Sequence, residues 1–132
     1  MSSSISSYFP YGRQSISEED IAAVVDVLRS PFLTQGPVVP AFEQSVVAKV
    51  GSLHGLAVNS ATSALHIACL ALGLGPGDRL WTSPITFVAS ANCGRYCGAD
   101  IDFVDINPLT GLIDIQALEA KLKIADVEGK LP

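Results

Sequence analysis

The sequence predicts an α/β protein with a mainly parallel sheet and flanking helices, and three observations lead to this fold class. Short apolar runs alternate with helix-like segments from about residue 56 to residue 123. The connections between them are short and carry turn residues, as in "GPGD" at 75–78. Hydrophobic residues make up 48% of the chain and charged residues only 16%, which is typical of a packed domain. Strands and helices that alternate in this way favour parallel pairing with right-handed crossovers.

Two helices are expected before the first strand. Ser17 precedes three acidic residues that suit the positive end of a helix dipole, and Pro31 should end this helix. A second helix should begin at Pro40 and run to Val50, with Gly51 as its cap. The apolar stripe expected on the first helix has helical spacing and consists of Ile21, Val24, Val25 and Leu28.

The rest of the chain should alternate strands with helices. Strands are expected at 56–58, 79–82 and 101–105, and helices at 62–72, from Thr86 or Phe87 to about Tyr96, and at 115–123. Three strands are too few for a sheet covered on both faces, and "KLP" at 130–132 resembles the approach to a further strand. The expected organisation is an arm at 1–16, helices with a loop at 17–51, and the first part of a truncated α/β domain at 52–132.

Charge and composition exclude several classes of protein. The net charge is −5, and no Lys/Arg cluster offers a surface for nucleic acid. The opening "MSSSISSYFP" lacks the features of a signal peptide, and polar residues interrupt every long apolar run. We therefore expect a cytoplasmic protein that binds neither nucleic acid nor membrane. Cys69, Cys93 and Cys97 suit neither a disulfide framework nor a zinc site, so we expect no metal and buried thiols.

The stretch "AVNSATSALH" at 57–66 places a polar turn between an expected strand and a helix. Ligands of α/β sheets bind beyond the carboxyl ends of strands, where the free N–H groups of a helix N-terminus attract anions. The hydroxyls of Thr62 and Ser63 would add donors, which predicts a phosphate site. Plain N-capping by Asn59 or Ser60 explains the same residues equally well. A glycine-rich dinucleotide fingerprint and a P-loop lysine are both absent from the sequence.

A second turn, "TSPITFVASAN" at 82–92, follows the next expected strand and should lie at the same sheet edge. Phe87, at the expected helix start, could place its ring over a flat heteroaromatic group. From the residues alone, a position in the core is the more common role for such a side chain, and both interpretations stay open. A phosphate site beside an aromatic platform would suit a phosphorylated planar cofactor.

An ordered set of segments extends these two motifs across the chain. They are "PYGRQSISEEDI", "LTQGP", "FE", "AVNSATSALHIA", "ALGLGPGD", "TSPITFVASAN" and "FVDINPLTGLID", from about residue 8 to residue 123. Together they resemble the opening third of the DegT/DnrJ-type nucleotide-sugar aminotransferases. The resemblance implies pyridoxal 5'-phosphate (PLP) as cofactor, an incomplete large domain of fold type I, and a homodimer. "NSATSAL" and "PITFVA" are most similar to the branch that aminates UDP-linked 4-keto-6-deoxy-N-acetylhexosamines for pseudaminic acid, with glutamate as amino donor.

The resemblance also implies roles for individual residues. Thr62 and Ser63 would bind the cofactor phosphate, and Phe87 would stack on the pyridine ring. The loop Thr34-Gln35-Gly36 would lie near the nucleotide-sugar substrate. The full set of positions implied to bind the cofactor is Ser60, Ala61, Thr62, Ser63 and Phe87.

No catalytic residue is expected in this chain. The cofactor needs a lysine that binds it covalently and a carboxylate on its pyridine nitrogen, and both are expected downstream. Asp105 is better explained as a strand-end cap than as that carboxylate. His54 and His66 are expected to be partly buried, satisfied side chains. None of the lysines lies in a matching motif: these are Lys49, Lys121, Lys123 and Lys130.

Two other functions remain open from the sequence. Members of the same family that carry histidine in place of the lysine are PLP-dependent sugar dehydratases, and only the downstream residue separates them from the aminotransferases. A non-catalytic phosphate-binding α/β module is the alternative outside the family. The abrupt end of the chain and its apolar composition favour an enzyme fragment over a module.

Overall fold

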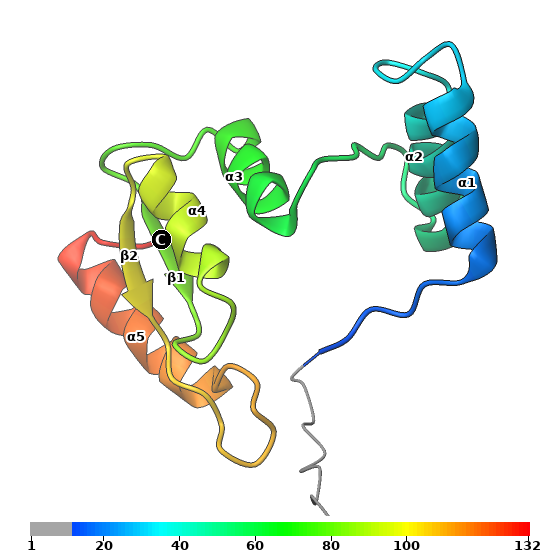
Figure 1. Ribbon diagram of the computed structural model, residues 1–132. Helices are drawn as coiled ribbons and strands as arrows, with labels where there is room; N and C mark the ends of the chain where they lie inside the picture. The colour runs from blue at the N-terminus through cyan, green and yellow to red at the C-terminus, as the bar shows by residue number, and fades with distance from the viewer. Residues whose placement is uncertain (1–11) are drawn as a thin grey trace, which may run out of the picture. The chain divides into compact units, whose positions relative to one another are not determined.

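The computed structural model describes residues 12–132, so most of the expected N-terminal arm lies outside the described residues. The described part contains five helices and two strands in the order α1, α2, α3, β1, α4, β2, α5 (Figure 1). The chain divides into two compact units, a first unit, Met1–Ala57, and a second unit, Val58–Pro132. Within the described residues, none of the helices combines the length and apolarity that crossing a bilayer requires.

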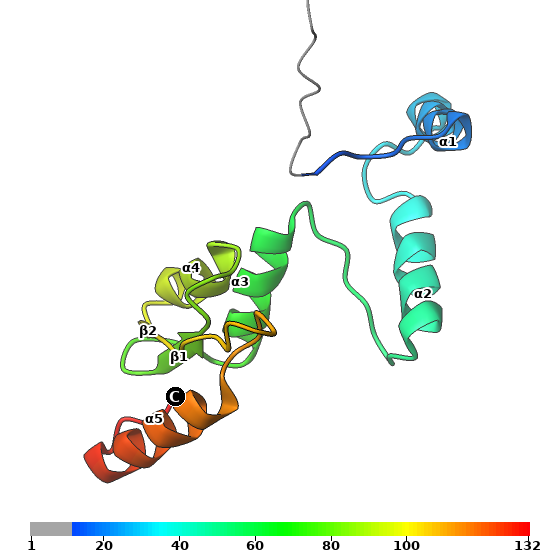
Figure 2. The ribbon, with the colours of Figure 1, turned by 90° about the horizontal axis from the view of Figure 1, so that it is seen from below.

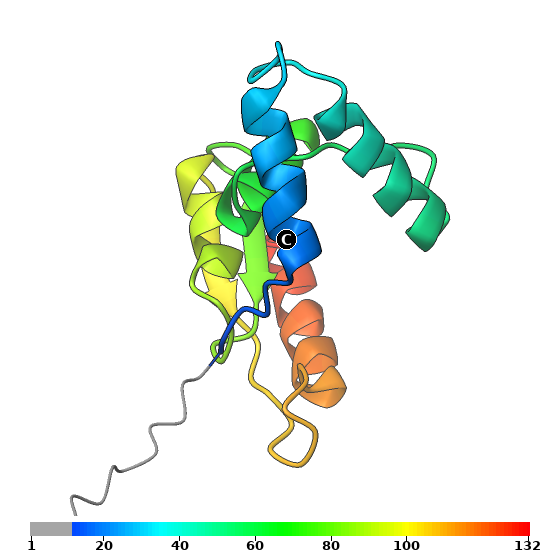
Figure 3. The ribbon, with the colours of Figure 1, turned by 45° about the vertical axis from the view of Figure 1, so that its right-hand side comes forward.

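The first unit consists of α1, Glu18–Arg29, and α2, Val38–Val50, joined by a loop (Figure 3). The expected start of α1 is confirmed by a capping box. The Ser17 hydroxyl accepts from the Asp20 N–H at 3.2 Å, and the Asp20 carboxylate accepts from the Ser17 N–H at 2.8 Å. α2 begins before the expected Pro40, because Pro37 serves as its N-cap, and Gly51 ends it in the left-handed conformation with φ 70°.

The expected strand at 56–58 is wrong for the described residues, where this segment pairs with no other strand. Its backbone is held instead by a side chain, because the Ala57 N–H donates to the Glu43 carboxylate of α2 at 2.8 Å. An extended segment becomes a strand only when a neighbour offers a matching row of N–H and C=O groups. The apolar pattern at 56–58 could therefore indicate extended backbone but not pairing.

The second unit contains a two-stranded parallel sheet with helices on both faces. β1, Arg79–Thr82, has the expected bounds, and β2, Asp100–Phe103, begins and ends earlier than expected. They pair in register with Leu80 opposite Ile101. Because side chains alternate along a strand, these two residues face Gly94 of α4. Seen from below, the sheet lies between α4 and α5 (Figure 2).

The helix boundaries correct several expectations. α3, Ala61–Ala71, agrees to within one residue at each end. α4, Ala89–Tyr96, begins later than Thr86 or Phe87, because a tighter turn comes first, with the Ser90 N–H donating to the Phe87 carbonyl at 2.9 Å. α5, Ile115–Glu128, runs past the expected end at Lys123 and stops at Gly129, whose φ is 64°. No strand forms at 130–132 in the described chain.

The core of the second unit is centred on α4, which packs against α3 and against both strands. The buried residues of this unit, one of them on α5, are small: Cys69, Ala89, Cys93, Ala99, Val104 and Ala125. The expectation of buried thiols is confirmed for Cys69 and Cys93, whereas Cys97 is half-buried. Burial, followed by the neighbouring Cys93, raises the pKa of the Cys69 thiol to about 11. These thiols therefore act as small apolar residues in the core.

The opposite face of the sheet is held by Lys121 of α5. Its ammonium group lies 2.6 Å from the Asp102 carboxylate, donates to the Phe103 carbonyl at 2.7 Å, and lies 5.1 Å from the centre of the Trp81 ring. The Lys121 side chain is 27% exposed, so this group is partly shielded from water. One side chain thus connects α5 to both strands.

The Lys121–Asp102 pair predicts an acid-dependent loss of stability in the second unit. A hydrogen bond from Lys121, followed by one from the Phe103 N–H, holds the pKa of Asp102 below its ordinary value. A depressed carboxyl pKa stabilises the fold above the unfolded pKa, near 3.9, and this contribution disappears as the pH falls through the lower folded value. The free energy of unfolding should therefore fall as the pH drops from about 4 through the lower pKa of folded Asp102.

Urea unfolding can be followed through the fluorescence of Trp81, the only tryptophan in the chain. The variant Lys121→Ala should lose stability less steeply with acid, because its Asp102 has no ammonium partner. An equally steep loss in both proteins would contradict this assignment.

Candidate functional site

The polar turn between Val58 and α3 is organised by a cluster of hydrogen bonds. Ser60 is the N-cap of α3, with its hydroxyl accepting from the Ser63 N–H at 3.2 Å. The Ser63 hydroxyl donates to the Asn59 side-chain carbonyl at 2.7 Å, and the hydroxyls of Ser60 and Ser63 lie 3.0 Å apart. The N-capping that sequence reasoning held open is therefore present, with Ser60 in that role.

Capping does not use all the donors of this turn. Among the described residues, no partner satisfies the N–H groups of Ala61 and Thr62 or the Thr62 hydroxyl. The N–H groups of the first helical turn have no acceptor within a helix, and the helix dipole makes this end positive. The first turn of α3 contains no acidic residue that would oppose this field. The turn can therefore receive an anion as well as cap its helix.

Phe87 lies on the loop before α4 rather than at the helix start, which corrects the sequence-based expectation. It is 57% exposed, so the alternative of a core position does not describe it in this structure. The neighbouring Ile85 is also exposed, at 69%. α3 and α4 pack against each other. The polar turn leads into the N-terminus of α3, and the loop that carries Phe87 leads into the N-terminus of α4. An exposed ring of this kind is free to stack on a planar ligand.

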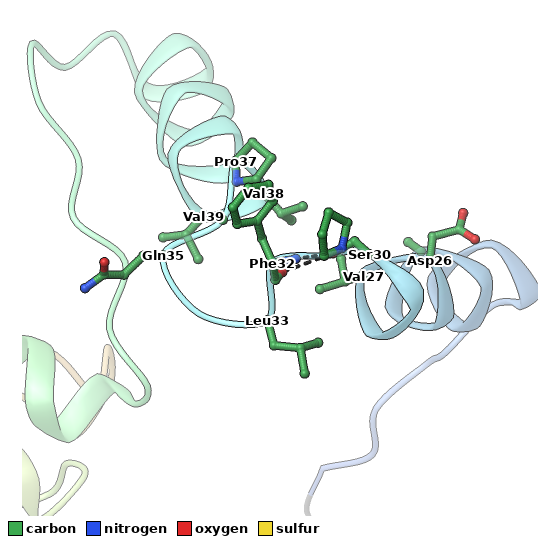
Figure 4. Close-up of a pocket in the computed structure, with 12 residues that line it drawn as sticks. Asp26, Val27, Ser30, Phe32, Leu33, Gln35, Pro37, Val38 and Val39 are labelled. Carbon is green, nitrogen blue, oxygen red and sulfur yellow. Dashed lines mark hydrogen bonds between the residues drawn. The ribbon is translucent and has the colours of Figure 1, made fainter.

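The loop Thr34-Gln35-Gly36 belongs to the first unit, and two of its residues, Gln35 and Gly36, line a pocket of about 520 Å³ (Figure 4). The pocket lining includes apolar side chains from the end of α1, the loop and the start of α2, among them Val27, Phe32 and Val39. Gln35 has φ 54°, a left-handed conformation that costs a non-glycine residue energy. At Gly36 an added Cβ would lie 3.0 Å from the Phe32 Cβ, so only glycine fits this turn without a shift.

Of the remaining candidates, Asp105 and His66 have structural partners and His54 is exposed. The Asp105 carboxylate accepts from the Ile106 N–H at 2.8 Å, as expected of a strand-end cap. The ring of His66 makes an edge-on contact with Tyr96, with centroids 5.3 Å apart. The expectation of partial burial is wrong for His54, which is exposed, because its short loop after Gly51 is not packed over in this structure. No group of potential metal ligands comes together among residues 12–132.

The lysines differ more than the sequence indicated. Lys123 and Lys130 form exposed ion pairs with Glu119 and Glu128, at 2.7 and 2.9 Å. Lys121 is instead the partly shielded link between α5 and the sheet, a role that helix periodicity alone did not suggest. A lysine whose ammonium is already paired in this way is a poor nucleophile.

Comparison with known proteins decides the family. The sequence profile of the DegT/DnrJ/EryC1/StrS aminotransferase family matches residues 14–125. The chain belongs to this family. Among curated members, it is 44% identical over 113 residues to the spore coat polysaccharide biosynthesis protein SpsC of Bacillus subtilis, covering 86% of this chain and 29% of that protein. It is 38% identical over 112 residues to a UDP-4-amino-4-deoxy-L-arabinose–oxoglutarate aminotransferase of Shewanella sediminis, covering 85% of this chain and 29% of that protein.

Solved structures of the family show the same fold. The PLP form of the putative sugar aminotransferase Spr1654 from Streptococcus pneumoniae matches with a TM-score of 0.80 and 33% identity, covering 85% of this chain and 29% of that one. Helicobacter pylori PseC, an aminotransferase involved in pseudaminic acid biosynthesis, matches with a TM-score of 0.78 and 38% identity, covering 85% and 30%. The family fold assigned from the sequence, an α/β part of a PLP-dependent transferase large domain, is confirmed. The chain spans about 29% of the length of the curated relatives it matches.

Proposed function

We propose that this chain forms the cofactor-phosphate site of a PLP-dependent aminotransferase that acts on nucleotide-linked 4-keto-6-deoxy sugars in amino-sugar and surface-polysaccharide biosynthesis. Membership of the family carries the proposal, because the matched region includes the whole polar turn before α3. The relatives named above are aminotransferases or polysaccharide biosynthesis proteins, which favours amination over dehydration as the reaction.

The residues present fit a phosphorylated planar cofactor. The open N–H groups of Ala61 and Thr62 and the Thr62 hydroxyl suit a phosphate at the positive end of α3. The exposed ring of Phe87 suits the pyridine face. Ser60 and Ser63 shape the turn. When bound, PLP supplies the electron sink that lets an amino group be exchanged.

The lysine and the carboxylate that this chemistry also needs are proposed to lie outside the present residues. Lys121 is committed to Asp102, and Lys123 and Lys130 are paired at the surface. Lys49 lies in the last turn of α2 in the first unit, where a basic side chain suits the helix dipole, whereas the polar turn belongs to the second unit. By itself the chain should therefore bind the cofactor without transaminating.

We further propose a cytoplasmic homodimer with a nucleotide sugar and glutamate as substrates. The exposure of Ile21, Val24 and Leu28, the apolar stripe of α1, supports a covering partner surface.

The decisive experiment is an assay of the protein produced from the complete reading frame that encodes this chain. With glutamate and a UDP-4-keto-6-deoxy-N-acetylhexosamine, amino-sugar product and 2-oxoglutarate should form in equal amounts. Loss of the sugar hydroxyl without transfer of nitrogen would identify the dehydratase instead. Binding of PLP without either reaction would support the non-catalytic module.

Phe87 provides a second test in the same protein. Replacing Phe87 with leucine should weaken PLP binding up to about tenfold, because an aromatic stacking contact contributes ~0.5–1.5 kcal/mol. Ile85→Ala is the matched control, since Ile85 is exposed on the same loop and should not touch the ring. Equal PLP dissociation constants for Phe87→Leu and the unmodified protein, measured by fluorescence titration, would remove Phe87 from the site.

A further inference from the structure

The hydroxyl groups of the turn before α3 differ in what they already bind. The hydrogen of a serine hydroxyl can serve one acceptor at a time. The Ser63 hydroxyl donates to the Asn59 carbonyl oxygen at 2.7 Å, a short and therefore well-formed bond. Its oxygen also lies 3.0 Å from the Ser60 hydroxyl. Ser63 has no hydrogen left for a ligand while this contact persists.

Ser60 is committed within the same cluster. Its oxygen accepts from the Ser63 N–H as the helix cap, and its hydroxyl reaches either Ser63 or the Asn59 oxygen, at 3.0 and 3.4 Å. Thr62 differs from both, because its half-buried hydroxyl has no partner among the described residues. The same holds for the N–H groups of Ala61 and Thr62. The turn is thus divided into a closed cap and an open set of donors.

We propose that Asn59 is a positioning residue, which keeps the Ser63 hydroxyl engaged so that Thr62 is the hydroxyl of this turn that donates to the cofactor phosphate. The inference rests on the proposed function, and it separates two residues that the family resemblance treats alike. Asn59 itself need not touch the ligand. Its effect is to decide which neighbouring hydroxyl is available.

The test compares pyridoxal 5'-phosphate with pyridoxal, which lacks the phosphate, as ligands of the full protein. The dissociation constant of pyridoxal divided by that of pyridoxal 5'-phosphate measures recognition of the phosphate alone. This quotient is the ratio used in the tests that follow. Both ligands are titrated into one preparation, so a partly unfolded variant lowers both apparent affinities and leaves the ratio unchanged. Thr62→Val should reduce the ratio by about tenfold or more, because a hydrogen bond to a charged group is lost. Ser63→Ala should change it by less than about twofold.

The role of Asn59 is tested by coupling between two substitutions. In an Asn59→Ala background the Ser63 hydroxyl is released, so Ser63→Ala should then reduce the ratio several-fold, although it has little effect when Asn59 is present. An equal effect of Ser63→Ala in both backgrounds would overturn the proposal, and so would an effect of Ser63→Ala alone as large as that of Thr62→Val. If Asn59→Ala fails to fold, the same measurement of Ser63→Ala in an Asn59→Leu background decides, because leucine has a similar volume and no acceptor.

Failure of the proposed function has a different signature. In that case the unmodified protein would bind pyridoxal 5'-phosphate no better than pyridoxal, and no substitution in the turn would change the ratio. A strong preference in the unmodified protein, lost equally in Thr62→Val and Ser63→Ala, would keep the phosphate site and reject only the assignment to Asn59.

Discussion

Replacing Gly94 with valine should lower the free energy of unfolding of the second unit by about 3 kcal/mol, the upper end of the usual cost of overpacking a core. Gly94 is buried where α4 crosses the sheet. A Cβ at this position would lie 2.6 Å from the Ile101 Cδ1 and 3.2 Å from the Leu80 Cβ. The isoleucine methyl could rotate away, but the Leu80 Cβ is fixed to β1. The helix would have to move off the sheet.

Gly75→Val is the matched control for this effect. A Cβ at Gly75 would meet only the Gly73 carbonyl oxygen, at 4.0 Å. The backbone before Pro76 also favours extended conformations that valine adopts easily. Urea unfolding followed by Trp81 fluorescence should show a change below about 0.5 kcal/mol for this variant. Equal losses at Gly75 and Gly94 would mean that the close approach of α4 to the sheet is not what makes Gly94 necessary.

Replacing Lys121 with alanine should cost about 2 kcal/mol and detach α5 from the sheet before the rest of the unit unfolds. The ammonium group serves a carboxylate, a carbonyl and an aromatic ring at once. Hydrogen bonds of charged groups contribute ~1.5–3 kcal/mol when shielded, whereas exposed ion pairs contribute under ~1 kcal/mol. Asp102 is 51% exposed, which places the expected loss below the sum of these contributions.

Lys123→Ala, on the same helix, separates this effect from a general loss of positive charge. Lys123 pairs with Glu119 one turn away, with 74% and 64% of the side chains exposed. Such a pair contributes about 0.3–0.5 kcal/mol. Hydrogen exchange of the α5 amides should accelerate in Lys121→Ala and stay almost unchanged in Lys123→Ala. Similar exchange in the two variants would contradict the special role of Lys121.

Local signals predicted the elements whose causes are local. Ser17 with Asp20, Gly51 and the "GPGD" turn all behave as their residue types indicate, and β1 has its expected bounds. Errors arose where a boundary depends on partners far along the chain. The segment at 56–58 has strand-like residues but pairs with no strand among residues 12–132, and α4 begins only after a turn at Phe87.

The site was predictable as a location and less so as an arrangement. The hydroxyl-rich turn before α3 indicated an anion site and a helix cap, and the structure shows the cap together with open donors. Spacing could not show that Asn59 binds Ser63 and leaves Thr62 free, because that depends on side-chain rotamers. The contact of Lys121 with both strands was likewise invisible to helix periodicity, since it depends on how α5 lies across the sheet.

The buried thiols between α3 and α4 give the second unit a built-in reporter of its own opening. Alkylating reagents attack the thiolate, and Cys69 is both enclosed and protonated at neutral pH, with its pKa at about 11. Cys93 is equally enclosed, and its thiol contacts the Ser90 carbonyl oxygen at 3.4 Å. Labelling of either cysteine therefore requires α3 to separate from α4. The labelling rates of Cys69 and Cys93, followed separately from that of the half-buried Cys97, thus report the openings of this core.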